Sequence, residues 1–225
     1  MKHLLLLTAL LSLISGCGDD TPTPTKAAEN TQTTAPDGND GKPRPPAKMP
    51  DGRVWMTENL NVEIGNSWCY HDSASYCKKY GRLYDWETAR AVCPTGFHLP
   101  SYDEWYGLVS AAGDWDMAGE KLKAKSGWNR YDQITPSGNY ENRDGNGNDE
   151  YGFSALPGGS RGDVENYGVG YGVGYSGIWW TNTEQEGTNK WEAHNIVMFA
   201  QFMAASEYSK PKTCGFSVRC IQNYE

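Results

Sequence analysis

Aromatic side chains and glycines, in place of long aliphatic side chains, dominate the part of this chain that is able to fold. The sequence has 9 Trp, 14 Tyr and 26 Gly in 225 residues, and every aromatic residue lies after position 50. Large aromatic rings bury much apolar area but need partners for their polar tips, and glycines favour turns. We therefore predict one α+β domain over residues 49–225, with short strands, short helices and long loops.

A leader occupies residues 1–16. Two polar or charged residues precede an apolar run at 4–14, which is shorter than the roughly 20 apolar residues that a membrane-spanning helix needs. A charged start, a short apolar middle and small residues at the end are typical of a secretory signal peptide. Cys17 follows a Ser-Gly pair directly, and this arrangement resembles the lipobox of bacterial lipoproteins, in which the cysteine receives lipid.

The leader therefore predicts an exported protein that is fastened to a membrane by lipid on Cys17, at the outer membrane or the cell surface. An ordinary secreted protein with a chance cysteine is the alternative. Asp19 and Asp20 resemble acidic export signals of some Gram-negative surface lipoproteins, or are two solvated acids in a linker. Residues 17–48 hold no aromatic residue and no aliphatic residue larger than Ala, so we expect this segment to be a disordered stalk.

The charge balance narrows the class of partner. The formal net charge is −8 at pH 7, and no basic cluster occurs in the sequence. Proteins that bind nucleic acids present a basic face to the phosphate backbone, so a nucleic-acid partner is not expected. The partners that remain are the membrane, through the N-terminal lipid, and a glycan or another surface protein.

Five cysteines follow the lipobox, which agrees with an oxidising compartment. Cys69 and Cys77 bracket a polar segment that we interpret as a turn stapled by its own ends. Cys93, just past a helix, could meet Cys220 and tie the ends of the domain together. Cys214 would then be a spare thiol. A zinc site is not indicated, because the sequence has no CxxC pair and no close pair of histidines.

Two helices carry the clearest local signals. The first is predicted at 86–92, with Asp85 as its N-cap. The second begins after Ser101, which forms a capping box with Glu104. A further helical turn is predicted at 117–122, and strands are predicted at 177–181, 193–198, 202–205 and 216–220.

Six ordered motifs carry a resemblance to a known family. They lie at 59–61 (NLN), 80–86 (YGRLYDW), 93–101 (CPTGFHLPS), 152–159 (GFSALPGG), 179–184 (WWTNTE) and 215–220 (GFSVRC). In this order they are similar to the motifs of the Fibrobacter succinogenes major paralogous domain, over roughly residues 49 to 223. That family in turn resembles the formylglycine-generating-enzyme and sulfatase-modifying group, and hence the C-type-lectin-like fold.

The resemblance implies two early helices beside small, irregular antiparallel sheets, with the chain ends close together, which a Cys93–Cys220 bridge fits. Oxidases of the wider group bind copper through a close cysteine pair, but here only Cys214 lies in that neighbourhood. Copper-dependent oxidation is therefore not expected. Binding is favoured over catalysis, and an enzyme of this superfamily with altered chemistry or a structural envelope lipoprotein is the alternative.

The histidines of the mature chain give no clear catalytic arrangement. His98 lies in a turn where a structural hydrogen bond is expected, and His71 is expected to be exposed. His194 could face a groove, but the sequence pairs it with no nucleophile. The carboxylates are many and scattered, and a glycosidase needs two of them at a defined separation that the sequence does not reveal. An enzyme is therefore neither excluded nor supported.

One polar segment, at 142–150, suggests calcium. Asp144, Asn146 and Asn148 supply oxygen donors at the first, third and fifth positions of a calcium-type loop. The pattern then departs from an EF-hand, which needs a glycine and a glutamate further along. An irregular Ca²⁺ site at these three residues is one hypothesis, and a plain Gly/Asn-rich turn is the other.

A second unusual segment, at 167–175, repeats tyrosine at every fourth position with glycines between. Tyr- and Gly-rich loops are favoured in adaptable binding surfaces. A ligand-binding role, by stacking on sugar rings or apolar side chains, is predicted for Tyr167, Tyr171, Tyr175, Trp179, Trp180 and Trp191. The alternative places at least one residue of the Trp-Trp pair in the core. The chain is thus expected to be an exported, lipid-anchored binding or adhesion module for a glycan or another surface protein.

Overall fold

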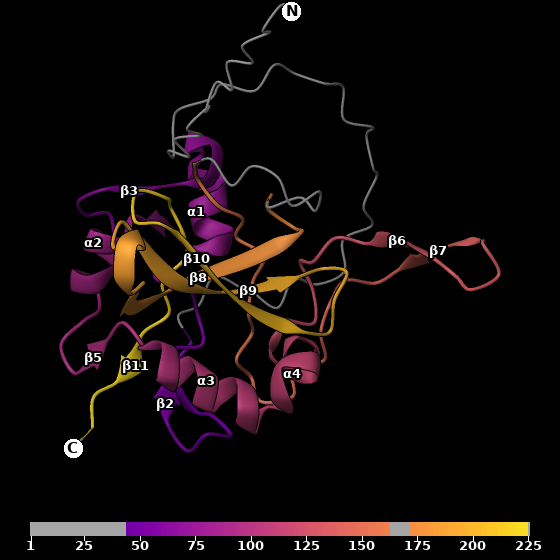
Figure 1. The fold of residues 1–225 in the computed structure, drawn as a ribbon, viewed down its shortest axis with the longest axis horizontal. Coiled ribbons are helices and arrows are strands. Elements are labelled where there is room, and N and C mark those ends of the chain that lie inside the picture. Colours follow the sequence, from indigo (N-terminus) through magenta and orange to yellow (C-terminus); the bar gives the residue numbers. More distant parts are fainter. Residues whose placement is uncertain (1–43, 163–171, 225) are drawn as a thin grey trace, which may run out of the picture.

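A computed structural model describes residues 44–162 and 172–224, and these residues form the α+β domain that the sequence predicts (Figure 1). The helices are α1 (Ala74–Tyr80), α2 (Trp86–Ala91), α3 (Tyr102–Ala111) and α4 (Asp114–Leu122), with 3-10 turns η1 (Tyr70–Asp72) and η2 (Gly187–Asn189). The strands are β1 (Ala47–Lys48), β2 (Val54–Trp55), β3 (Ser67–Trp68), β4 (Leu83–Tyr84), β5 (Phe97–His98), β6 (Tyr131–Ile134), β7 (Tyr140–Arg143), β8 (Ser176–Glu184), β9 (Glu192–Phe199), β10 (Ala205–Pro211) and β11 (Ile221–Gln222).

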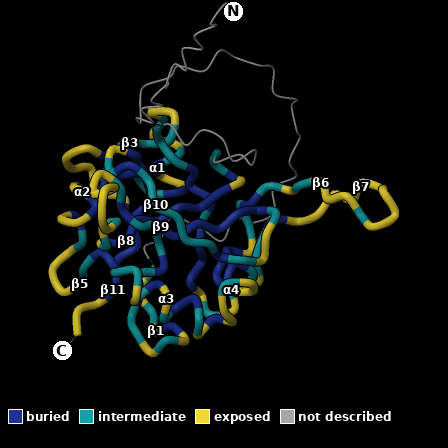
Figure 2. The backbone as a smooth tube through the Cα atoms, viewed as in Figure 1, coloured by how far each residue is buried: buried dark blue, intermediate teal, exposed yellow. Residues whose placement is uncertain are grey.

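An antiparallel three-stranded sheet in the order β10-β9-β8 forms the centre of the domain. Its two faces are both covered, so the adjacent residues Trp179 and Trp180 of β8 are buried on opposite sides. Trp179 packs in a cluster with residues of α3 and α4, whereas Trp180 packs in a cluster with residues of α2 and the C-terminal segment. The buried positions run along β8 and β9, as Figure 2 shows.

Aromatic rings make up much of the core, as the composition predicts. The ring centroids of Trp55 and Trp105 are 4.9 Å apart, and those of Trp105 and Trp179 are 6.0 Å apart. Phe153 meets Trp55 edge-on with a centroid distance of 6.0 Å. Such tilted and edge-on pairs are favourable beyond the area that they bury, and they link β2, α3 and β8.

A four-stranded sheet in the order β1-β2-β11-β5 joins the two ends of the described domain. Ile221 of β11 lies opposite Trp55 of β2, so the C-terminal strand pairs with one of the first strands. β1 pairs with β2 in turn, which means that the ordered domain begins before residue 49. The predicted disordered stalk is therefore too long at its C-terminal end, because residues 44–48 already take part in the fold.

Both predicted disulfides are present. Cys93 and Cys220 form a bond with an S–S distance of 2.03 Å across 127 positions, next to the sheet that joins the ends. Cys69 and Cys77 form the second, with an S–S distance of 2.05 Å. Cys214 is fully buried and is not a free thiol, so the prediction of a spare thiol at this position is wrong.

The predicted helix caps are confirmed. Asp85 accepts a hydrogen bond of 2.8 Å from the Thr88 backbone N–H at the start of α2. At the start of α3, Ser101 Oγ accepts from the Glu104 N–H at 3.1 Å and the Glu104 carboxylate accepts from the Ser101 N–H at 2.8 Å. The predicted turn at 117–122 is the C-terminal part of α4, which begins three residues earlier.

Other predictions need correction. The segment between Cys69 and Cys77 contains the 3-10 turn η1 and the first three residues of α1, and is not a plain turn. The strand predicted at 202–205 begins only at Ala205, since the preceding residues turn from β9 to β10 and Met203 O accepts a hydrogen bond from Glu120 N–H. Residues 216–220 make isolated bridges, such as Phe216 with Tyr84, and no continuous strand.

The hairpin of β6 and β7 projects away from the rest of the described structure (Figures 1 and 2). Its side chains are almost all exposed, including those of Ile134 and Tyr140 at 62 % and 74 % of their full areas. A hairpin without a packed face is marginally stable in water, so it contributes little to the core.

Candidate functional site

A buried polar centre connects most of the sequence motifs. Asn59 Oδ1 accepts hydrogen bonds from Trp179 Nε1 and from Arg219 Nη2, each at 2.9 Å. The Asn59 side-chain amide donates to Tyr80 O at 2.9 Å and to Ser217 Oγ at 3.3 Å. Arg219 in turn contacts the Phe153 segment, so five separate stretches of the chain meet at this centre. They contain Asn59, Tyr80, Phe153, Trp179 and Arg219.

Arg219 is the charged member of this centre and is fully buried. Its guanidinium donates to the carbonyl oxygens of Phe153 and Ser154 and lies over the Phe153 ring, 4.3 Å from the centroid. Burial lowers the pKa of Arg219 to about 9, and the charges of Asp149 and Glu58 act in the opposite direction. The sequence motifs thus form the scaffold of the domain, and the buried guanidinium of Arg219 bonds to other parts of that scaffold.

The predicted aromatic binding residues that the structure describes do not form one exposed surface. Trp179 and Trp180 are fully buried, so their predicted contact with a ligand is wrong; the covered faces of the central sheet leave neither ring accessible. Tyr175 and Trp191 are exposed, at 42 % and 49 %. Tyr167 and Tyr171 lie outside the described residues, as does Cys17, the predicted lipid attachment site.

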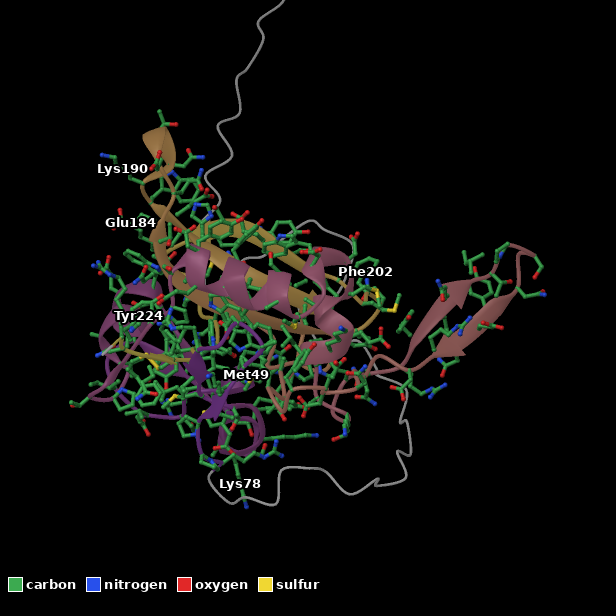
Figure 3. All side chains as sticks on the ribbon, turned by 90° about the horizontal axis from the view of Figure 1, so that it is seen from below. Met49, Lys78, Glu184, Lys190, Phe202 and Tyr224 are labelled. Atoms are coloured by element: carbon green, nitrogen blue, oxygen red, sulfur yellow. A yellow bond between two sulfur atoms is a disulfide. The ribbon has the colours of Figure 1, made fainter. Side chains whose placement is uncertain are left out.

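Trp191 belongs to the long connection between β8 and β9. Figure 3 shows this connection as a projection from the central sheet, with Glu184 and Lys190 near its end. Phe202 lies at the opposite end of the same sheet in this view. Trp191, the residue after Lys190, therefore contributes an exposed ring to this connection.

Each of the three predicted calcium residues has a side-chain oxygen that accepts a hydrogen bond from an amide N–H of the protein. Asp144 Oδ1 accepts from the Asn146 backbone and side-chain amides at 3.0 and 2.7 Å. Asn146 Oδ1 accepts from the Trp128 N–H at 3.0 Å, and Asn148 Oδ1 accepts from the Glu150 N–H at 3.1 Å. Within residues 44–162 and 172–224, no group of three or more His, Cys, Asp or Glu residues is placed to hold a metal ion.

A cation of the chain itself lies against this loop. Lys123 is 2 % exposed, and its Nζ donates to four carbonyl oxygens, those of Gly145, Phe199, Ala200 and Phe202, at 2.8, 3.1, 3.4 and 3.0 Å. The ammonium is also 5.1 Å from the centroid of the Trp128 ring. Burial lowers the pKa of Lys123 to about 8, while the charges of Asp144 and Glu120 raise it. The ammonium therefore ties the polar loop to the turn between β9 and β10.

His98 has the structural role that the sequence suggests. Its Nδ1 is 2.7 Å from Asn223 Oδ1, and its Nε2 is 3.0 Å from Glu104 Oε1, which also pairs with Arg53 at 3.0 Å. Burial acts to raise the pKa of Glu104, but hydrogen bonds from Ser101, His98 and Arg53 outweigh it and lower the pKa overall. This cluster fastens the C-terminal residues to the start of α3. His71 is exposed, as expected.

A groove lies between the edge strand β10 and the helices α3 and α4. Its volume is about 410 Å³, and it is lined by Tyr102, Trp115, Ala205, Ser206, Glu207 and Tyr208. Tyr106 continues the row of rings, with centroids 6.3 Å from Tyr102 and 6.2 Å from Trp115, and is 49 % exposed. The groove opens broadly to solvent, so it would hold a ligand against its wall and not enclose it.

His194 stands beside this groove, as the sequence suggested. Its Nδ1 is 2.5 Å from Glu207 Oε1, and its ring centroid is 5.6 Å from that of Tyr102. Burial raises the pKa of the Tyr102 hydroxyl, and the negative charge of Glu207 raises it further. A carboxylate thus lies between an imidazole and a phenol at the wall of an aromatic groove.

Sequence reasoning missed the groove because its parts come from three distant segments. Tyr102 is the first residue of α3, Trp115 lies in the first turn of α4, and Glu207 is near the middle of β10. One weak sequence signal pointed to the groove: Trp115 lies between two aspartates, and a fully buried tryptophan seldom has two charged neighbours. The residues around Ser206 and Tyr208 carried no motif.

No helix among the described residues combines the length and the apolar character needed to cross a bilayer. A scan against protein-family models matches residues 51–222 to the Fibrobacter succinogenes major domain. Neither the search of curated proteins nor the search of solved structures returned a match. The matched residues include all the members of the buried polar centre, from Asn59 to Arg219.

Proposed function

The chain belongs to the Fibrobacter succinogenes major domain family, and we propose that it is an exported, lipid-anchored binding module that recognises a glycan in the groove between β10, α3 and α4. The observation that carries this proposal is the composition of the groove wall: the rings of Tyr102 and Trp115 face a space of about 410 Å³ that is shared with Glu207 and Ser206. Sugar rings present apolar C–H faces and polar edges, so aromatic rings beside hydrogen-bonding groups suit them.

The size and shape of the groove favour a sugar over a large protein partner. A stable protein–protein contact buries about 800 Å² on each side, whereas this groove is lined by only six residues. One or two sugar units match such a space. Of the two ligands expected from the sequence, we therefore propose a glycan and not another surface protein.

The location rests on the leader and Cys17, which lie outside the described residues. The two disulfides support an oxidising compartment. The stalk that follows the lipobox would hold the groove at a distance from the membrane. Lipidation of Cys17 and display at the outer membrane or cell surface are thus parts of the same proposal.

A relation to the C-type-lectin-like fold is a further part of the proposal. It is supported by short helices beside small antiparallel sheets and by chain ends that meet in one sheet, next to Cys93–Cys220. A fold relation of this kind does not by itself supply a binding site.

The test is binding of the purified mature protein to a glycan array, followed by titration of any sugar that is retained. Tyr102→Ala and Trp115→Ala should each weaken binding about tenfold or more, in line with the loss of about 1.4 kcal/mol or more from one stacked ring. Tyr140→Ala is the matched control, because this tyrosine is 74 % exposed on the β6–β7 hairpin. Retention of full affinity in both groove variants would contradict the proposal, and so would an array without any binding.

A further inference from the structure

The groove carries negative charge beside its aromatic rings, and from this we infer that its glycan ligand bears a protonated amine. The inference rests on the proposed glycan-binding function and names the class of sugar. Its structural basis is the carboxylate of Glu207, which lines the groove together with Tyr102 and Trp115.

The charge of Glu207 is not neutralised by a permanent cation among the described contacts. The groups that contact it are the imidazole of His194, at 2.5 Å, and the hydroxyl of Tyr102. Lys210 of β10 and Lys212, just after the strand, act on other carboxylates. Lys212 pairs with Glu184 at 3.4 Å, and the charge of Lys210 acts on Glu192.

Further acidic groups surround the same rings. Asp103 follows Tyr102 on α3 and is exposed, and its charge acts on the Tyr102 hydroxyl. Asp114 and Asp116 flank Trp115 in the first turn of α4, and both are exposed. Two carboxylates, Glu207 of β10 and Asp103 of α3, therefore act on the same tyrosine, which disfavours an acidic sugar beside it.

Aromatic faces next to a carboxylate are the chemistry that recognises an ammonium group. A cation over a Tyr or Trp ring is attracted by the negative face of the ring, and a partly desolvated carboxylate adds a charge-assisted hydrogen bond. A sugar with a free amine satisfies both and still presents its C–H face to a second ring. An N-acetylated sugar has the same ring but no charge, so it provides a matched comparison.

The experiment compares glucosamine tetramers with N-acetylglucosamine tetramers by calorimetric titration of the purified mature protein. We expect the free amine to bind about tenfold more tightly. Glu207→Gln keeps an oxygen that can accept from His194 but removes the charge, so it should abolish the preference. Glu141→Gln, the same substitution on the exposed β7 strand, should leave the preference unchanged.

The outcomes separate this inference from the function on which it rests. Equal affinity for the two tetramers, or a preference that survives Glu207→Gln, would overturn the amine inference and leave the glycan-binding function intact. Binding of a lysine-rich peptide, together with no binding of any sugar on the array, would overturn both. Binding of acidic oligosaccharides in preference to the amine would also overturn the inference.

Discussion

Trp179 donates a hydrogen bond of 2.9 Å from its indole N–H to the Oδ1 atom of Asn59, a residue 120 positions earlier in the chain. The same oxygen accepts from Arg219 Nη2 at 2.9 Å. One side-chain amide therefore satisfies a buried ring and a buried charge. The domain depends on this because a buried donor without a partner costs far more than a typical hydrogen bond gains.

Replacing Asn59 by Leu should strongly destabilise the domain. The change would leave Trp179 Nε1 and part of the Arg219 guanidinium without an acceptor, at roughly 1–3 kcal/mol for each unsatisfied donor. We expect a loss of about 3 kcal/mol in the free energy of unfolding, measured by urea denaturation. Asn139→Leu, in the exposed turn between β6 and β7, is the control. An unfolding midpoint within error of the wild type would show that the polar centre contributes nothing.

The sequence predicts those parts of the fold that depend on local signals. The caps of α2 and α3 each involve two residues that are three positions apart in the sequence. Asp85 and Ser101 accept the predicted hydrogen bonds. The burial of both Trp179 and Trp180 could not be predicted in this way. Alternation along a strand distinguishes an inner from an outer face, but it cannot show that a helix covers each face.

The polar loop and the groove show the same limit. Asp144 and Asn146 resemble cation ligands in sequence, yet a lysine more than 20 positions earlier lies against the loop and contacts Gly145. Likewise, Glu207 becomes informative only when β10 lies beside α3. Residues that meet through tertiary packing, without a shared motif, give no signal in a single sequence.

Lys123→Met should lower stability and should do so without a dependence on calcium. The variant leaves four carbonyl oxygens around Nζ without their donor, while Met keeps much of the apolar stem. We expect a fall in melting temperature of about 4 °C or more, the shift that follows from roughly 2 kcal/mol. The wild type should melt at the same temperature with calcium and with a chelator. A clear rise with calcium would instead support a metal site at Asp144, Asn146 and Asn148.

Lys123 should also shape the pH dependence of stability. Its pKa is lowered to about 8 in the folded state from 10.5, so between these values the unfolded chain binds more protons and stability rises with pH. The wild type should therefore gain stability relative to Lys123→Met as the pH increases from about 8 to about 10.5. Urea denaturation of both proteins at several pH values measures the difference. A constant difference across this range would contradict the assignment.

The two disulfides should contribute unequally. The Cys93–Cys220 bridge closes 127 positions and the Cys69–Cys77 bridge closes 8. In the loop-entropy model these closures are worth about 5 and about 2.5 kcal/mol, respectively. Cys93→Ala with Cys220→Ala should thus unfold at a lower denaturant concentration than Cys69→Ala with Cys77→Ala. The reverse order would show that the short loop stabilises by local packing around α1.

Lipid on Cys17 can be tested separately from the fold. Cys17→Ser should release the protein from the membrane fraction, because single residues of the stalk offer no apolar surface that could replace acyl chains. The released domain should keep its unfolding midpoint, since both described disulfides and the polar centre lie at or beyond Asn59. The intact mass of the wild type, extracted from membranes, should exceed that of the processed polypeptide by the mass of the lipid. Membrane retention of Cys17→Ser, or a Cys17 found in a disulfide and without lipid, would contradict the anchor.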